Sequence, residues 1–248
     1  MKRILIFIFC LSFFLAKSQH CIPVNLSHSQ YPGFSIEYKD SKVYQRVGFS
    51  IDVERRIYDS SGRILYIVTL NVINQKDRRD TIVDMIKLFK YKKNRISVME
   101  YYSDDTSANS KIFDLYYLYN GKGMLVKQEV IHRARQTHNQ NYSAKYYWKG
   151  KNLSKAELYV KTKANIDSLQ ESLEFTKYDT NPNYEKLYEN YYLIGNFKCF
   201  SNNNYTETII KMDGKEWTNK VNYIYNEKGY PVKEIGEGYE IDIEYKCE

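Results

Sequence analysis

Tyr223-Ile224-Tyr225-Asn226-Glu227-Lys228-Gly229-Tyr230-Pro231-Val232 is the cleanest copy of a phrase that decides the fold of this chain. The phrase is tyrosine, Asn or Asp, a short spacer, glycine and then a branched aliphatic residue. Three further copies lie upstream, and the third of these is worn: Ile57-Tyr58-Asp59-Ser60-Ser61-Gly62-Arg63-Ile64-Leu65, Tyr117-Leu118-Tyr119-Asn120-Gly121-Lys122-Gly123-Met124-Leu125 and Tyr146-Tyr147-Trp148-Lys149-Gly150-Lys151-Asn152-Leu153.

Each copy predicts a β-hairpin. Asn or Asp favours the first position of a type I turn, because its side-chain oxygen can accept hydrogen bonds from backbone N–H groups ahead of it. The glycine three residues later accepts a positive φ, so the turn can end in a bulge that restores strand pairing. The phrase contains no nucleophile, base or metal ligand, and we interpret it as structural.

The hairpins predict an all-β protein, a long antiparallel meander curled into a half-barrel or an open sandwich. Alternating residues, such as Leu115, Tyr117 and Tyr119 on one face, support the strands. The absence of a Gly/Ser-rich linker predicts a single domain over residues 34–248. Residues 81–91 fit both helical and strand periodicity, and the turn that follows them favours a strand.

One short helix is predicted near 184–193. Tyr184, Leu187, Tyr188 and Tyr191 have helical spacing, and Asn183 is a suitable N-cap. We interpret this helix as a lid over one end of the sheet.

Residues 1–18 have the pattern of an export signal. Lys2 and Arg3 precede an apolar run over 4–15, and Ala16-Lys17-Ser18 supplies small residues for cleavage after Ser18. We therefore expect a periplasmic or extracellular protein, with residues 19–33 as an extended N-terminal tail. No second apolar stretch follows, which predicts no transmembrane segment in the mature chain.

Three cysteines remain after cleavage, Cys21, Cys199 and Cys247. An oxidising compartment favours one disulfide among three possible pairings. We favour Cys199–Cys247, because Cys21 lies in the predicted tail. A lipid anchor on Cys21 is disfavoured, since Ser18-Gln19-His20 is a poor match to a lipoprotein signal.

The charge and motifs exclude several functions. Cleavage removes Lys2, Arg3 and Lys17, so the formal charge falls from +7 to +4, too mild and scattered to favour nucleic-acid binding. His132 and His138 lack a third metal ligand, and no catalytic or phosphate-binding motif is present, so we expect no cofactor and no enzyme activity. The carboxylates of 237–244 fit a solvated edge strand, namely Glu237, Glu240, Asp242 and Glu244.

Tyrosine is heavily over-used, at 26 residues. Adjacent tyrosines on a strand must divide between its two faces, so some rings face outward or into a groove. Such rings offer rigid contact area with a polar tip. The candidate binding surface consists of these aromatic residues: Tyr117, Tyr119, Tyr147, Trp148, Tyr191, Tyr192, Tyr223 and Tyr225. The competing interpretation is cross-strand ladders that only stabilise the sheet.

Four segments resemble a family of exported bacterial domains of unknown function. They are the run 178–183, the aromatic stretch that follows it, Ser201-Asn202-Asn203-Asn204-Tyr205 and the closing hairpin. More distantly, the chain resembles the tyrosine–aspartate (YD/RHS-type) repeats of secreted bacterial shell proteins. The resemblance covers mainly residues 170–248. It implies a curled antiparallel sheet in the envelope or outside the cell, and it transfers no catalytic residue.

These observations favour an exported, non-enzymatic binding or envelope-associated protein with a tyrosine-rich surface. Its expected partners are a glycan, a peptide or an envelope protein. Two alternatives from other classes remain open, a glycan hydrolase built from scattered carboxylates and a periplasmic carrier that holds an apolar ligand inside the sheet.

Overall fold

The computed structural model shows an all-β protein and describes residues 21–30, 34–39, 42–48, 52–75, 78–102, 111–132, 141–161, 167–188 and 197–247. The described residues form a single 17-stranded sheet. The strands are β1 (Cys21–His28), β2 (Phe34–Lys39), β3 (Lys42–Gly48), β4 (Asp52–Tyr58), β5 (Ile64–Gln75), β6 (Arg78–Lys92), β7 (Arg95–Tyr102), β8 (Lys111–Tyr119), β9 (Leu125–His132), β10 (Tyr142–Lys149), β11 (Asn152–Lys161), β12 (Asp167–Pro182), β13 (Asn203–Met212), β14 (Lys215–Lys220), β15 (Asn222–Tyr225), β16 (Pro231–Gly236) and β17 (Tyr239–Cys247).

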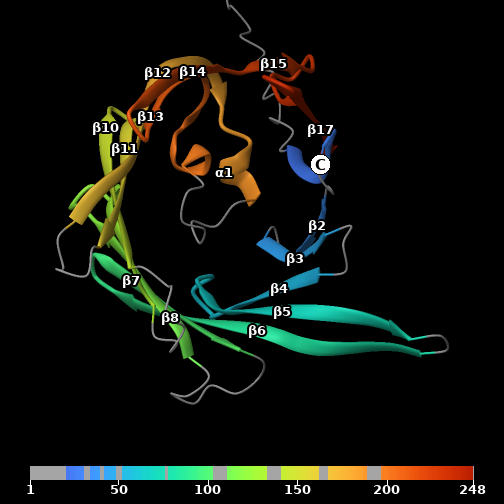
Figure 1. Ribbon diagram of the computed structural model, residues 1–248. Helices are drawn as coiled ribbons and strands as arrows, with labels where there is room; N and C mark the ends of the chain where they lie inside the picture. The colour runs from blue at the N-terminus through green and yellow to red at the C-terminus, as the bar shows by residue number, and fades with distance from the viewer. Residues whose placement is uncertain are drawn as a thin grey trace, which may run out of the picture.

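The sheet is the predicted antiparallel meander, and it curls almost fully round on itself (Figure 1). From β2 to β14 each strand pairs with the next one along the chain. The sheet agrees with the half-barrel alternative, in a nearly closed form, and it is one sheet rather than the two of an open sandwich. Residues 81–91 belong to strand β6, as the following turn suggested.

Two joints complete the ring. At the first joint, β14 pairs with β13 and β15 pairs with β16. The two strands are joined directly by the chain, which continues from β14 into β15. Val221 stands at this bend, buried, and its N–H donates to the Thr206 carbonyl at 3.0 Å. At the other joint, β1 lies between β17 and β2, with a long ladder to β17 and a two-pair ladder to β2.

The hairpin turns confirm the chemistry expected of the repeated phrase. The side-chain oxygens of Asp59, Asn120 and Asn226 each accept two backbone N–H bonds, from the second and the fourth residue ahead, at 2.9–3.0 Å. The glycines that follow have positive φ, for example +79° at Gly229. In the worn copy Gly150 also has positive φ, at +64°.

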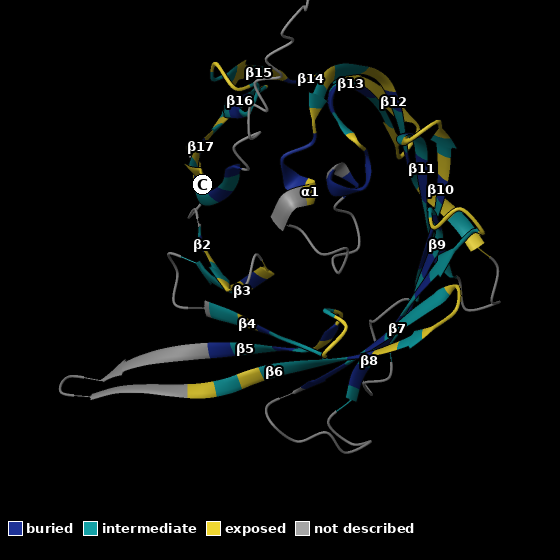
Figure 2. Cartoon of the chain, turned by 180° about the vertical axis from the view of Figure 1, so that it is seen from behind, coloured by how far each residue is buried: buried dark blue, intermediate teal, exposed yellow. Residues whose placement is uncertain are grey.

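An inner segment, residues 183–188 and 197–202, runs inside the ring of strands and is largely buried (Figures 1 and 2). It contains one helical turn, α1 (Glu185–Tyr188), and one 3-10 turn, η1 (Lys198–Phe200). Phe197 and Phe200 enter the main core with Leu153 and Tyr205, while Tyr184 joins a smaller core beside β1–β3 and β17. A ring this wide is not filled by strand side chains alone, so a segment of chain completes its core.

The helix predicted near 184–193 is not established. The described chain has the single turn α1, and residues 189–196 lie outside the described residues. The segment also lies inside the ring, whereas a lid over the end of the sheet was expected. In the described parts of the chain, no helix is long and apolar enough to cross a membrane.

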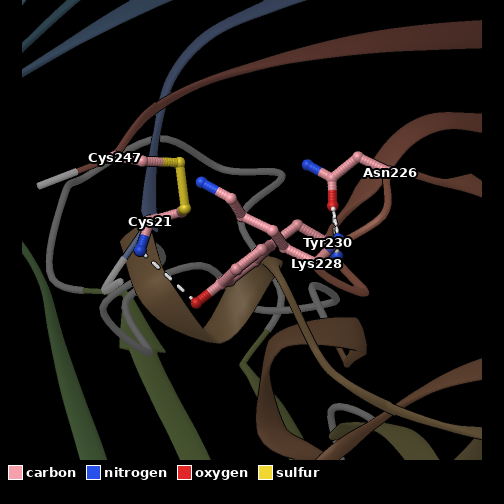
Figure 3. Close-up of a disulfide and its surroundings, with 5 residues drawn as sticks. All are labelled: Cys21, Asn226, Lys228, Tyr230 and Cys247. Carbon is pink, nitrogen blue, oxygen red and sulfur yellow. Dashed lines mark hydrogen bonds between the residues drawn. A yellow bond between two sulfur atoms is a disulfide. The ribbon is translucent and has the colours of Figure 1, made fainter. Parts of the chain in front are cut away.

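Two expectations about the N-terminus are wrong. Residues 21–28 form strand β1 rather than part of a loose tail, and the disulfide joins Cys21 to Cys247 rather than Cys199 to Cys247 (Figure 3). In the antiparallel register Cys21 stands directly opposite Cys247, with the two Cα atoms 4.1 Å apart. Cys199 lies buried in the inner segment. Because the Cys21 sulfur is in the bridge, it does not carry a lipid.

Removal of the Asn226 side-chain acceptor should loosen the last hairpin. We expect Asn226→Ala to lower the free energy of unfolding by about 1–2 kcal/mol, since two backbone N–H groups lose their partner. Asn226→Asp keeps an acceptor oxygen, as Asp59 does in the first copy, and should stay close to the parent. Urea denaturation measures both. An equal loss in the Asp variant would contradict this explanation.

The disulfide should account for much of the stability of the closed ring. We expect Cys21→Ser with Cys247→Ser to cost about 2–5 kcal/mol, because the bridge closes a very long loop of chain. Hydrogen exchange should show the loss of protection first in β1 and β17. Cys199→Ser is the matched control and should leave the bridge intact, as non-reducing peptide mapping would show. A disulfide that contains Cys199 in the parent protein would refute the pairing.

Candidate functional site

A pocket of about 360 Å³ opens at the rim where the hairpin turns and the inner segment meet. Its walls come from three parts of the chain, the β8–β9 turn, the β10–β11 turn and the inner segment, with Ile96 of β7 at the side. The lining residues are Ile96, Tyr119, Gly123, Met124, Leu125, Trp148, Lys151, Lys186, Phe200 and Asn202. We call this the rim pocket.

The β-bulges of the repeated phrase place two aromatic rings in the rim pocket. The strand register shifts just before each turn, so that Tyr119 pairs with Leu125 and Trp148 pairs with Leu153. The Trp148 indole N–H donates to the Leu125 carbonyl at 2.7 Å, which joins the two hairpins and fixes the ring. The turns therefore orient the aromatic wall of the pocket.

Asn152 fastens the inner segment to the β10–β11 turn. Its side-chain oxygen accepts the N–H groups of Asn202 and Asn203, at 3.0 and 3.1 Å. The Ser201 hydroxyl accepts a hydrogen bond from the Leu153 N–H at 3.0 Å. In this copy of the phrase the asparagine follows the glycine, and here its side chain holds the inner segment rather than the turn.

Phe200 forms the third aromatic wall of the rim pocket. It is buried, and its ring meets the Tyr146 ring edge-on with centroids 5.3 Å apart. The Tyr146 hydroxyl in turn donates to Gln128 at 2.5 Å. Edge-to-face packing and the anchored hydroxyl hold this wall rigid.

Two lysines stand at the pocket. The Lys186 ammonium donates to the Asn202 side-chain oxygen at 2.7 Å, and Lys151 is exposed beside it. Partial burial lowers the pKa of Lys186; Cys199 opposes the shift and the positive charge of Lys151 adds to it. No Asp or Glu stands among the described residues that line the pocket.

The structure brings together only part of the predicted aromatic surface. Tyr119 and Trp148 line the rim pocket. Tyr117 is fully buried in the core. Tyr147 points away from the core, is 43% exposed, and donates its hydroxyl to Glu157 at 2.8 Å. Tyr191 and Tyr192 lie outside the described residues.

Tyr223 packs against both cores, and Tyr225 lies beside it. The Tyr223 ring lies 6.4 Å from that of Tyr184 and 6.1 Å from that of Tyr225, between centroids. The Tyr225 hydroxyl donates to the Asp179 carboxylate and accepts from the Asn204 side chain. These two tyrosines fix the end of β12 against β15, so they take a structural role.

Sequence reasoning missed the residues that the inner segment contributes, Lys186, Phe200 and Asn202. They lie far along the chain from the hairpins they face, and no local pattern marks them. Lys151 had a signal, since it lies in the worn copy of the phrase. Only the fold shows that this turn and the inner segment share a pocket.

The carboxylates of 237–244 do not lie on the predicted edge strand. Strand β17 pairs with both β16 and β1, so it is not an edge. Glu240 and Asp242 both pair with the Lys233 ammonium, at 2.8 and 3.2 Å. Across the described residues no three His, Cys, Asp or Glu side chains gather as metal ligands, and His138 lies outside that part.

No protein-family model and no curated protein matches this sequence. Two solved structures are similar in shape, both described as porin-like proteins. The one from Bacteroides uniformis ATCC 8492 has a TM-score of 0.41 and 11% identity over 91% of this chain and 98% of its own. The one from Bacteroides vulgatus ATCC 8482 has a TM-score of 0.44 and 10% identity over 91% and 99%. Similarity at this level assigns neither a family nor a function, and the resemblance to tyrosine–aspartate repeats stays a prediction.

The tyrosines on the outer face of β10 and β11 should control the titration of Glu157. Burial alone would raise its pKa, but bonds donated by Lys155, Tyr159 and Tyr147 outweigh it and lower the pKa of Glu157 to about 2. This carboxylate therefore stabilises the fold above the ordinary carboxyl range, and the contribution is lost as the pH falls towards 2.

We expect the double variant Tyr147→Phe, Tyr159→Phe to raise the pKa of Glu157 towards its ordinary range. Carboxyl NMR titration measures the shift directly. Tyr44→Phe, an exposed tyrosine on another strand, is the control and should leave Glu157 unchanged. An unaltered Glu157 in the double variant would show that Lys155 alone sets its titration.

Proposed function

We propose that this protein is an exported, envelope-associated and non-enzymatic binding protein, and that it binds a compact saccharide in the rim pocket. The observation that carries the proposal is the convergence of three aromatic side chains, Tyr119, Trp148 and Phe200, from three separate parts of the chain. Aromatic walls with a few fixed polar groups are typical of small-ligand sites.

The size of the rim pocket favours a ring-shaped ligand over an extended peptide. Its volume of about 360 Å³ lies at the lower end of the range of ligand pockets. Peptides commonly bind by adding a strand to a sheet edge. The rim pocket is instead enclosed by turns and by the inner segment. A sugar can place its apolar face on the rings and its hydroxyls on Asn202 and backbone groups.

The export part of the proposal rests on covalent chemistry. The bridge Cys21–Cys247 is of the kind that persists in oxidising compartments outside the cytosol. The predicted signal over residues 1–18 agrees with it. The carrier alternative has less support, because aromatic residues of the inner segment occupy the interior of the ring.

The chain offers a direct test, because it has two tryptophans and one of them lines the pocket. In a Trp217→Phe background Trp148 is the single fluorescent indole. We expect sugars identified on a glycan array to change its emission on binding. Tyr119→Ala should weaken that binding at least tenfold, as for an aromatic side chain at the centre of a binding site.

Tyr147→Ala is the matched control, since Tyr147 neighbours Trp148 in sequence but is exposed on the outer face. It should leave binding unchanged. A silent array, or an equal loss in the Tyr147 variant, would refute saccharide binding in the rim pocket.

A further inference from the structure

We propose that the saccharide bound in the rim pocket carries a negatively charged group, held by the ammonium groups of Lys151 and Lys186. The inference rests on the proposed function and names the class of its ligand. It depends on a separate observation, the charge of the lining, which is independent of the aromatic walls.

Within the described part of the chain, the lining of the rim pocket has two cations and no carboxylate. Lys151 and Lys186 are the only charged residues among the described residues that line the rim pocket. Lys186 donates to a neutral amide oxygen, that of Asn202. Over the residues that the structure describes, neither lysine forms an ion pair. An anion entering the pocket therefore meets two positive charges without displacing an acidic side chain.

Many lysines elsewhere on the sheet are matched with carboxylates. Lys127 pairs with Glu129 at 2.7 Å, Lys155 with Glu157 at 2.8 Å and Lys177 with Glu207 at 2.8 Å. The rim pocket departs from this arrangement. Charge repulsion between Lys151 and Lys186 contributes to the lowered pKa of Lys186, so a bound anion would relieve an existing repulsion.

The geometry of the rim pocket suits a single sugar ring that carries one charged substituent. The aromatic walls of Tyr119, Trp148 and Phe200 would take the ring, and the lysines stand at the edge on the side of the inner segment. Charge-assisted hydrogen bonds to a carboxylate, sulfate or phosphate are stronger than bonds to neutral hydroxyls. The shared chemistry is thus a sugar with an anionic group, whether a uronic acid or a sugar phosphate.

The test uses Trp148 fluorescence in the Trp217→Phe background, with four probes: galacturonate, glucose 6-phosphate, and the neutral galactose and glucose. We expect the charged sugars to bind at least tenfold more tightly than their neutral counterparts. Their affinity should fall as salt is raised. Comparison of the affinities for galacturonate and glucose 6-phosphate distinguishes a carboxylate from a phosphate ligand.

Lys186→Met and Lys151→Met should each weaken binding of the charged sugar about tenfold and leave the neutral sugar unchanged. Lys186→Arg keeps the charge and should retain most of the affinity. Lys228→Met removes the same charge from the exposed β15–β16 turn and should have no effect. Each of these three side chains keeps much of its surface in solvent, Lys186 being partly buried at its ammonium end, so circular dichroism should report an unaltered fold.

The outcomes separate the two proposals. If charged and neutral sugars bind equally, or the lysine variants bind the charged sugar as the parent does, the anionic ligand is refuted while the saccharide pocket stands. If no sugar changes Trp148 emission and the array is silent, the proposed function fails and the inference fails with it.

Discussion

The structure depends on the pairing of strand edges around a nearly closed ring. A free strand edge exposes backbone N–H and C=O groups that invite association with other chains. Here the N-terminal strand β1 lies between β17 and β2, and the bridge Cys21–Cys247 holds it there. At the opposite joint the chain bends at buried Val221 and passes from one neighbour to the next. The first and last strands are thus as necessary to the fold as any hairpin between them.

The wide ring of strands leaves an interior that the strand side chains do not fill, and the inner segment fills this space. Phe197 and Phe200 supply its apolar contacts, and Asn152 fastens it to a hairpin turn. The same packing brings Phe200 and Lys186 to the rim. The candidate site is therefore a consequence of how the core is completed, because the side chains that fill the ring also form one wall of the pocket.

The excess of tyrosine is explained mainly by structure. Several inward-facing rings place their hydroxyls on fixed acceptors, as Tyr58 does with the Val43 carbonyl and Tyr184 does with Glu234. A buried tyrosine hydroxyl usually has a hydrogen-bond partner of this kind. Of the six aromatic residues selected from sequence that the structure describes, Tyr119 and Trp148 line the rim pocket and the other four do not. Composition alone could not separate Tyr119 from Tyr117, a tyrosine two positions earlier that is fully buried.

The sequence by itself determined the local structure: the hairpins, the turns at Asp59, Asn120 and Asn226, and the all-β meander that they connect. Turn geometry depends on a few adjacent residues, so it is written in a short phrase. Only the tertiary structure decided the partner of Cys247, the role of residues 21–28 as a strand and the place of the inner segment. Each of these depends on contacts between residues far apart in the chain, which no local pattern encodes. The rim pocket belongs to the second group, since its walls meet only after the ring has closed around them.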